Sequence, residues 1–163
     1  MHSLIVGMTE SGKSTLAKKI AKNLVAKKQP VMVLDILGSK WDANYNTTNI
    51  HEFMNYVKQV KNTFIFIDES GEVGALYKEF FWLATKSRHY GHSVFFITQR
   101  SMQLKPVVRS QCRQLFLFCS AKKDCQILHD DFNKKEILNG NELRQGTFLQ
   151  VKRFEATKKI KLF

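Results

Sequence analysis

Residues 7–14 form a glycine-rich motif between a short apolar segment and an amphipathic one. The sequence there is GMTESGKS, which fits the pattern G-x-x-x-x-G-K-[ST]. The apolar segment at residues 3–6 is typical of a buried strand, and residues 14–27 have the period of a helix. Strand, loop and helix therefore follow in the order of a phosphate-binding P-loop. This order restricts the chain to folds in which a buried strand leads into a helix at a phosphate site.

The residue types of this loop suit phosphate binding. Glycine lets the backbone turn so that successive N–H groups point inward, and the start of the helix adds partial positive charge. Lys13 is expected to reach the β- and γ-phosphates of ATP, and the Ser14 hydroxyl to ligate the Mg²⁺ that bridges them. The residues predicted to contact ATP are Gly7, Met8, Thr9, Glu10, Ser11, Gly12, Lys13, Ser14 and Thr15.

Two further apolar segments end in side chains suited to ATP hydrolysis. Residues 63–67 lead into Asp68 and Glu69, the form of a Walker B strand, where the Asp holds the magnesium shell and the Glu acts as general base toward water. Residues 93–97 lead into Thr98-Gln99-Arg100, where the Gln99 amide is placed to sense the γ-phosphate. A kinase must keep water from the γ-phosphate, so Glu69 favours an ATPase over the alternative of a small P-loop kinase.

The apolar periodicity predicts an α/β fold. Strand-helix-strand order after a P-loop implies a parallel sheet. We therefore expect a three-layer P-loop NTPase fold, RecA/ASCE-like, with a central, mostly parallel sheet flanked by helices and a C-terminal β-hairpin. With 163 residues, 44% of them apolar, we expect a single domain over residues 1–163. Strands are expected at 3–6, 31–36, 63–67, 93–97 and 114–119, helices at 14–27, 50–61, 72–88, 121–131 and 134–139, a loop at 37–49, and the hairpin at 146–151 and 158–162.

The charge of the chain favours a polyanionic partner. Its 26 Lys and Arg against 14 Asp and Glu give a net charge of +12, so nucleic acid is the first candidate. One face of the first predicted helix and the C-terminal tail are rich in lysine. Each either contacts DNA or is only solvated, and lysines on an edge strand also discourage aggregation. These residues are Lys18, Lys19, Lys22, Lys27 and Lys28 in the helix, and Lys152, Arg153, Lys158, Lys159 and Lys161 in the tail.

Other classes of protein are disfavoured. The three cysteines show no C-x-x-C spacing, so neither a disulfide framework nor a zinc site is indicated, and no apolar run is long enough to span a membrane. Because Met1 lies directly before the first predicted strand, we expect no signal peptide or N-terminal accessory domain. His89 and His92 lack a third metal ligand and are expected in a surface loop. Trp41 and Tyr45 either stack on a base or pack on the core.

Taken in order, these motifs resemble the FtsK–HerA superfamily of DNA-pumping ATPases. The residues that carry the resemblance are the P-loop, the Asp68-Glu69 strand end, the turn Arg88-x-x-Gly91 before Thr98-Gln99-Arg100, and residues 106–112. The compact length is most similar to the viral branch, the genome-packaging ATPases of tailless icosahedral viruses with an internal membrane, such as those of tectiviruses.

This resemblance implies a homo-oligomeric ring, a pentamer or hexamer, with ATP bound between neighbours and double-stranded DNA in the channel. An arginine finger would act in trans on the γ-phosphate, and Arg88 matches best, with Arg109 or Arg113 as alternatives. The implied function is packaging of a viral genome into a preformed capsid, with capsid or portal vertex proteins as partners. The implied location is the host cytoplasm or the packaging vertex of the virion. A cellular or plasmid DNA translocase, or a conjugation ATPase, is the alternative.

Overall fold

The computed structural model describes residues 1–76 and 78–163. The strands of this part of the chain form an 8-stranded sheet in the order β3-β2-β4-β5-β1-β6-β7-β8. Neighbours from β3 to β6 are parallel, whereas β7 and β8 are antiparallel additions at one edge. The strands are β1 (His2–Val6), β2 (Val31–Leu34), β3 (Tyr45–Thr47), β4 (Phe64–Ile67), β5 (Ser93–Thr98), β6 (Cys112–Leu117), β7 (Thr147–Lys152) and β8 (Lys158–Lys161). The predicted mostly parallel sheet and C-terminal hairpin are confirmed.

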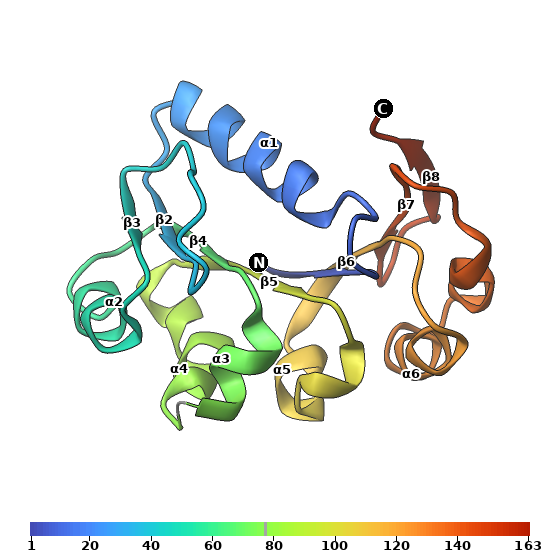
Figure 1. Cartoon of the computed structure of the whole chain (residues 1–163). Coiled ribbons are helices and arrows are strands. Elements are labelled where there is room, and N and C mark those ends of the chain that lie inside the picture. The colour runs from blue at the N-terminus through green and yellow to red at the C-terminus, as the bar shows by residue number, and fades with distance from the viewer. Residues whose placement is uncertain (77) are drawn as a thin grey trace.

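Helices cover both faces of the sheet, as predicted (Figure 1). Helix α1 (Lys13–Ala26) lies on one face. The other face carries α2 (Ile50–Val57), α3 (Ser70–Leu76), α4 (Phe80–Thr85), α5 (Pro106–Ser110) and α6 (Lys122–Phe132). Short 3-10 helices are η1 (Ser87–Tyr90), η2 (Ser101–Gln103) and η3 (Lys135–Glu142).

The apolar side chains of each strand alternate between two cores. In β1, Ile5 faces the core beneath α1, where it joins Leu16 and Ala17 of that helix. Leu4 and Val6 face the larger core shared with helices α2 to α6. Because both faces are buried, the strands are nearly continuous apolar runs rather than alternating ones. The two layers of helices leave the ends of the strands as the open part of the sheet, and the polar motifs lie there.

The predicted helix at 72–88 is wrong as a single element. Tyr77 lies outside the described residues, but α3 ends at Leu76, α4 begins at Phe80, and η1 follows. A Cβ added at Gly74 would lie 3.1 Å from the Phe80 ring, so these residues pack together across six positions. A straight helix places residues six apart on different faces. The chain therefore bends to bring Phe80 into the core, where it is 1% exposed.

Smaller differences have local causes. Residues 45–47, inside the predicted loop, form β3, a short parallel edge strand that pairs with β2. Residues 134–139, predicted as α-helix, lie mostly in the 3-10 helix η3. His92 is buried rather than on the surface: its Nδ1 accepts from the Thr63 N–H at 3.2 Å, and its Nε2 lies 3.1 Å from the Val57 carbonyl oxygen. Among the described helices, none combines the length and hydropathy needed to cross a bilayer.

Candidate active site

The P-loop connects the end of β1 to the start of α1. Gly12 has φ 115°, a left-handed conformation that favours glycine, and α1 begins at Lys13. Phe118, which follows β6, explains both glycines of the motif. A Cβ on Gly7 would lie 2.6 Å from the Phe118 Cβ, and one on Gly12 would lie 2.9 Å from its Cε1. The Lys13 ammonium donates to the Met8 carbonyl oxygen at 2.8 Å, so the side chain folds back over the loop.

Unsatisfied groups in this loop suit an anion. The Ser11 Oγ is buried without a hydrogen-bond partner among the described residues, and the first N–H groups of α1 have no partner within the helix. Burial lowers the pKa of the Lys13 ammonium, while the carboxylates of Glu69 and Asp68 act to raise it. Lys13 and the start of α1 line a hollow together with Gly12, Ser14 and Thr15, and Ser11 lines a neighbouring hollow on the other side of the loop. A phosphate group bound there would supply the acceptors that the loop lacks.

The two predicted carboxylates follow β4 directly. Asp68 is 7% exposed, and its Oδ1 accepts from the Glu69 N–H at 3.0 Å. Glu69 has φ 50°, and its carbonyl accepts from Glu72 and Val73, which turns the chain into α3. Burial raises the pKa of Asp68 to about 6, with the charges of Asp35 and Glu69 adding to the effect and the Glu69 N–H and Lys13 opposing it. The left-handed conformation of Glu69 thus turns the chain from β4 into α3 at the position of the two carboxylates.

A third carboxylate, Asp35, was not among the predicted site residues. It follows β2 and is 1% exposed, and it accepts from the Trp41 Nε1 at 2.9 Å, from the Ser39 hydroxyl, and from the Leu37 N–H at 2.9 Å. Burial acts to raise the pKa of Asp35, but these hydrogen bonds prevail and lower it. The carboxylate is therefore ionised beside Asp68. The available signal was an acidic residue among the last residues of the otherwise apolar segment predicted as a strand at 31–36.

Trp41 packs on the core, the second of the two roles considered for it. Its ring is 7% exposed and lies 5.7 Å from the Phe66 ring, with the Lys18 ammonium 5.5 Å away from its centre. Tyr45 lies against Tyr56, with ring centroids 4.8 Å apart. Neither ring lines the hollow at the P-loop.

Gln99 follows β5, the strand between β4 and β1. The ends of these three parallel strands therefore place Gln99 between the Asp68-Glu69 pair and the P-loop. The Ser70 hydroxyl donates to the Ile97 carbonyl at 2.8 Å and joins the end of β5 to the segment after β4. Among the described residues, no group of three His, Cys, Asp or Glu side chains converges to hold a metal. A magnesium ion there would need phosphate oxygens and water as further ligands, as is usual for this ion.

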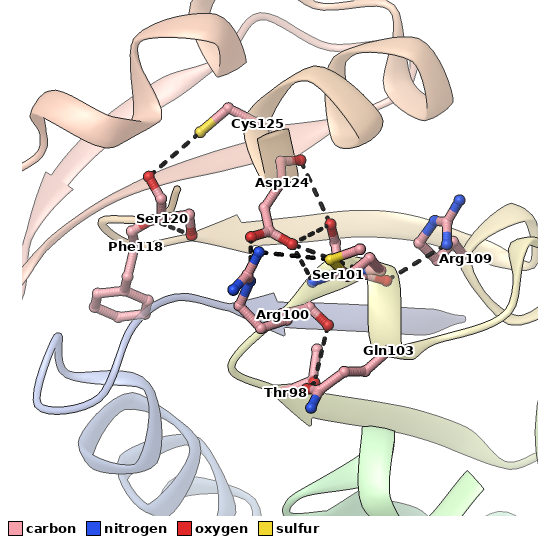
Figure 2. A network of polar contacts seen from close by, with 10 residues as sticks. Thr98, Arg100, Ser101, Gln103, Arg109, Phe118, Ser120, Asp124 and Cys125 are labelled. Carbon is pink, nitrogen blue, oxygen red and sulfur yellow. Dashed lines mark hydrogen bonds and ion pairs between the residues drawn. The ribbon is translucent and has the colours of Figure 1, made fainter. Parts of the chain in front are cut away.

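A buried carboxylate of α6 fixes the segment after Gln99 (Figure 2). Asp124 is fully buried and accepts from the Arg100 Nε at 2.6 Å, the Ser101 N–H at 2.8 Å and the Ser101 hydroxyl at 2.9 Å. Thr98 donates from its hydroxyl to the Gln103 Oε1 at 3.2 Å. These contacts hold the residues on both sides of Gln99. No motif in the sequence indicated Asp124, which lies 24 residues beyond Arg100.

The three candidate arginines occupy different environments. Arg88 is exposed in η1, before β5, at the edge of the sheet opposite the P-loop. The strand separates the two by about 20 Å, so Arg88 cannot reach the P-loop of its own chain. Arg113, at the start of β6, is also exposed and lines the same surface hollow as Arg88. Arg109 is buried and committed: its Nε donates to Asp131 at 2.6 Å, and its Nη1 lies 3.4 Å from the Ser101 carbonyl.

The strand order, the P-loop and the polar strand ends together define a P-loop NTPase fold. The chain belongs to the family described as AAA domain, which it matches over residues 2–104. Among curated proteins, no sequence is significantly similar to the chain.

Solved structures extend the likeness to the whole chain. The genome packaging NTPase B204 of Sulfolobus turreted icosahedral virus 2, in complex with AMPPCP, has a TM-score of 0.78 and 19% identity over 99% of this chain and 97% of that one. The DNA-packaging ATPase B204 of Sulfolobus turreted icosahedral virus has a TM-score of 0.80 and 19% identity, with 99% and 97% covered. The pCW3 conjugation coupling protein TcpA has a TM-score of 0.78 and 16% identity, with 99% and 60% covered. The resemblance to FtsK–HerA-type ATPases is confirmed at the level of the fold.

Proposed function

We propose that the protein is an ATPase that drives double-stranded DNA through a homo-oligomeric ring and packages a viral genome into a preformed capsid. The observation that carries the proposal is the meeting of three strand ends at one edge of the sheet, where the P-loop, the Asp68-Glu69 pair and Gln99 lie together. The likeness to two virus packaging ATPases, over nearly their whole length, supports this choice of substrate. The whole chain, residues 1–163, would act as one domain.

Each residue of this edge has a proposed role. Lys13 and the N–H groups of the P-loop bind the phosphates of ATP, and Ser14 and Asp68 hold Mg²⁺. The ion, when bound, neutralises charge on the β- and γ-phosphates. Glu69 accepts a proton from the attacking water, and Gln99 hydrogen-bonds that water or the γ-phosphate. Lys13 must leave the Met8 carbonyl to reach a phosphate oxygen. Its ammonium then donates to a charged oxygen instead of a neutral one, which makes the hydrogen bond stronger.

The remaining part of the site would come from a neighbouring subunit. Arg88 is exposed and lies far from its own P-loop, so it can act only on the nucleotide of another copy. A pentamer or hexamer, arranged head to tail, would bring the Arg88 edge of one subunit to the P-loop edge of the next. Arg113 lines the same hollow and is the remaining alternative, whereas Arg109 is buried and already paired with Asp131, which makes it a poor candidate.

The net charge of +12 supports DNA as the partner inside the ring, because lysine and arginine contacts to phosphate hold a duplex without reading its sequence. Packaging would place the ring at a capsid or portal vertex, in the host cytoplasm and then on the virion. A DNA translocase of conjugation is the second candidate, favoured by the likeness to TcpA. Association of the protein with purified empty capsids would separate the two.

The test is the ATPase rate per subunit against protein concentration, with and without duplex DNA. The rate should rise with concentration and with DNA, and Glu69→Gln should bind ATP without turnover. Arg88→Ala and Lys13→Ala should each be inactive, yet a mixture should regain activity, because the intact Arg88 of one variant faces the intact Lys13 of the other. A rate independent of concentration and DNA would exclude the ring mechanism.

A further inference from the structure

The hollow at the P-loop has a second wall that the ATPase motifs do not include. Besides residues of the loop, Gln145 and Phe163 of the C-terminal segment line it. The Phe163 side chain packs on Gly146, where an added Cβ would lie 2.6 Å from its Cε2, yet the residue is 59% exposed. An aromatic ring that is supported by backbone on one side and open on the other offers a flat face on which another planar ring can stack.

Hydrogen bonds fix this wall relative to the phosphate loop. The Gly146 N–H donates to the Ser11 carbonyl at 3.0 Å, and the Gln145 Nε2 donates to the Glu10 carbonyl at 2.9 Å. The Leu162 N–H donates to the Gly146 carbonyl at 2.6 Å and so places the neighbouring Phe163. These bonds place the Gln145 amide, and the backbone that precedes Phe163, beside the phosphate site.

We propose that Phe163 and Gln145 bind the adenine base of the nucleotide, an inference that rests on the proposed ATPase function. With the phosphates at the start of α1, the base would lie in the same hollow and stack on the Phe163 ring. Because the Gln145 Nε2 is committed to Glu10, its Oε1 is the atom left to face the base. A carbonyl oxygen accepts from the 6-amino group of adenine and repels the 6-oxo group of guanine. Gln145 would thus select ATP over GTP.

The experiment is calorimetric titration of the full chain with ATP, GTP and inorganic tripolyphosphate, each with Mg²⁺. Phe163→Ala should weaken ATP binding about tenfold, because the base loses its stacking contact, and should leave binding of tripolyphosphate, which has no base, unchanged. Phe163→Trp should retain ATP affinity. Phe154→Ala is the matched control, since Phe154 is 92% exposed in the β7–β8 connection and does not line the hollow. Gln145→Ala should reduce the ratio of ATP to GTP affinity.

The outcomes separate this inference from the proposed function. Unchanged ATP affinity in Phe163→Ala, or an equal loss for tripolyphosphate, would overturn the base site. If Lys13→Ala still loses both ligands in that case, the P-loop assignment stands while the base site fails. A wild-type chain that binds neither ATP nor tripolyphosphate would overturn both.

Discussion

Replacing Asp68 by asparagine should stabilise the protein in the absence of nucleotide. The pKa of Asp68 is raised from 3.8 to about 6, mainly by burial, so ionisation is less favourable in the folded state than in the unfolded chain. Below pH 3.8 the carboxyl is protonated in both states and does not lower the free energy of unfolding. Between pH 3.8 and 6 the unfolded chain ionises first, so the free energy of unfolding falls until the folded carboxyl is ionised as well. At pH 7 the loss amounts to about 3 kcal/mol, which Asp68→Asn should recover in large part.

Urea unfolding at several pH values measures this effect. The stability gain of Asp68→Asn should be about 3 kcal/mol at pH 7 and about half as large at pH 5, because the free energy that the unfolded chain gains by ionising this carboxyl shrinks as the pH falls toward 3.8. Asp35→Asn is the control with opposite sign. The pKa of Asp35 is lowered by its hydrogen bonds from Ser39 and Trp41 despite burial, so removing its charge should destabilise the fold.

Two results would refute this reasoning. Destabilisation by Asp68→Asn at pH 7 would show that the Asp68 charge stabilises the folded state, because its attraction to Lys13 outweighs the cost of burial. A stability change that does not vary between pH 5 and pH 7 would show that ionisation is not its cause. The expected gain in stability, with loss of ATP turnover, would mark Asp68 as a residue kept for chemistry at a cost to folding.

Three further predictions concern the scaffold. Asp124→Asn should lower the free energy of unfolding by about 2–3 kcal/mol, as measured by urea unfolding, because it removes the charge from a fully buried acceptor. The control Asp130→Asn, at an exposed position of the same helix, should change the free energy of unfolding little. Gly146→Ala should lower the melting temperature more than Gly38→Ala: both have φ near 70°, but only at Gly146 would a Cβ lie within 3 Å of an aromatic ring. Burial lowers the pKa of His2 from 6.5 to about 4, so stability present above pH 6.5 should fall by about 3 kcal/mol as the pH drops toward 4, as measured by pH-dependent unfolding.

The sheet and its helices were predictable because local patterns determine them. Continuous apolar runs such as residues 64–67 can be buried on both faces only in a covered sheet, and the P-loop motif requires a strand before it and a helix after it. Edge strand β3 was missed because Tyr45–Thr47 is short and only partly buried, so it carries little apolar signal. The bend between α3 and α4 depends on a contact of Gly74 with Phe80, which no helical periodicity expresses.

The candidate site was predictable where it follows strand ends and not where it depends on tertiary contacts. Asp68 and Gln99 directly follow strands that the pattern identified, Lys13 follows the loop after a third, and parallel pairing brings those strand ends to one edge. Asp124 reaches the same region from a helix, through hydrogen bonds to residues distant in the sequence. Phe163 lines the hollow at the P-loop because the closing hairpin runs beside β6. The roles assigned to these side chains stay predictions until they are measured.

The opposite placement of the P-loop and Arg88, at the two ends of the parallel strands, also restricts the symmetry of any assembly. If one end must face the other to complete the site, the contact joins unlike surfaces and is heterologous. A twofold dimer pairs identical surfaces and would leave every nucleotide without its arginine. Repetition of a heterologous contact either closes into a ring or continues as a helical filament, depending on the rotation between neighbours. Small changes at that contact would therefore alter the number of subunits before they altered the chemistry.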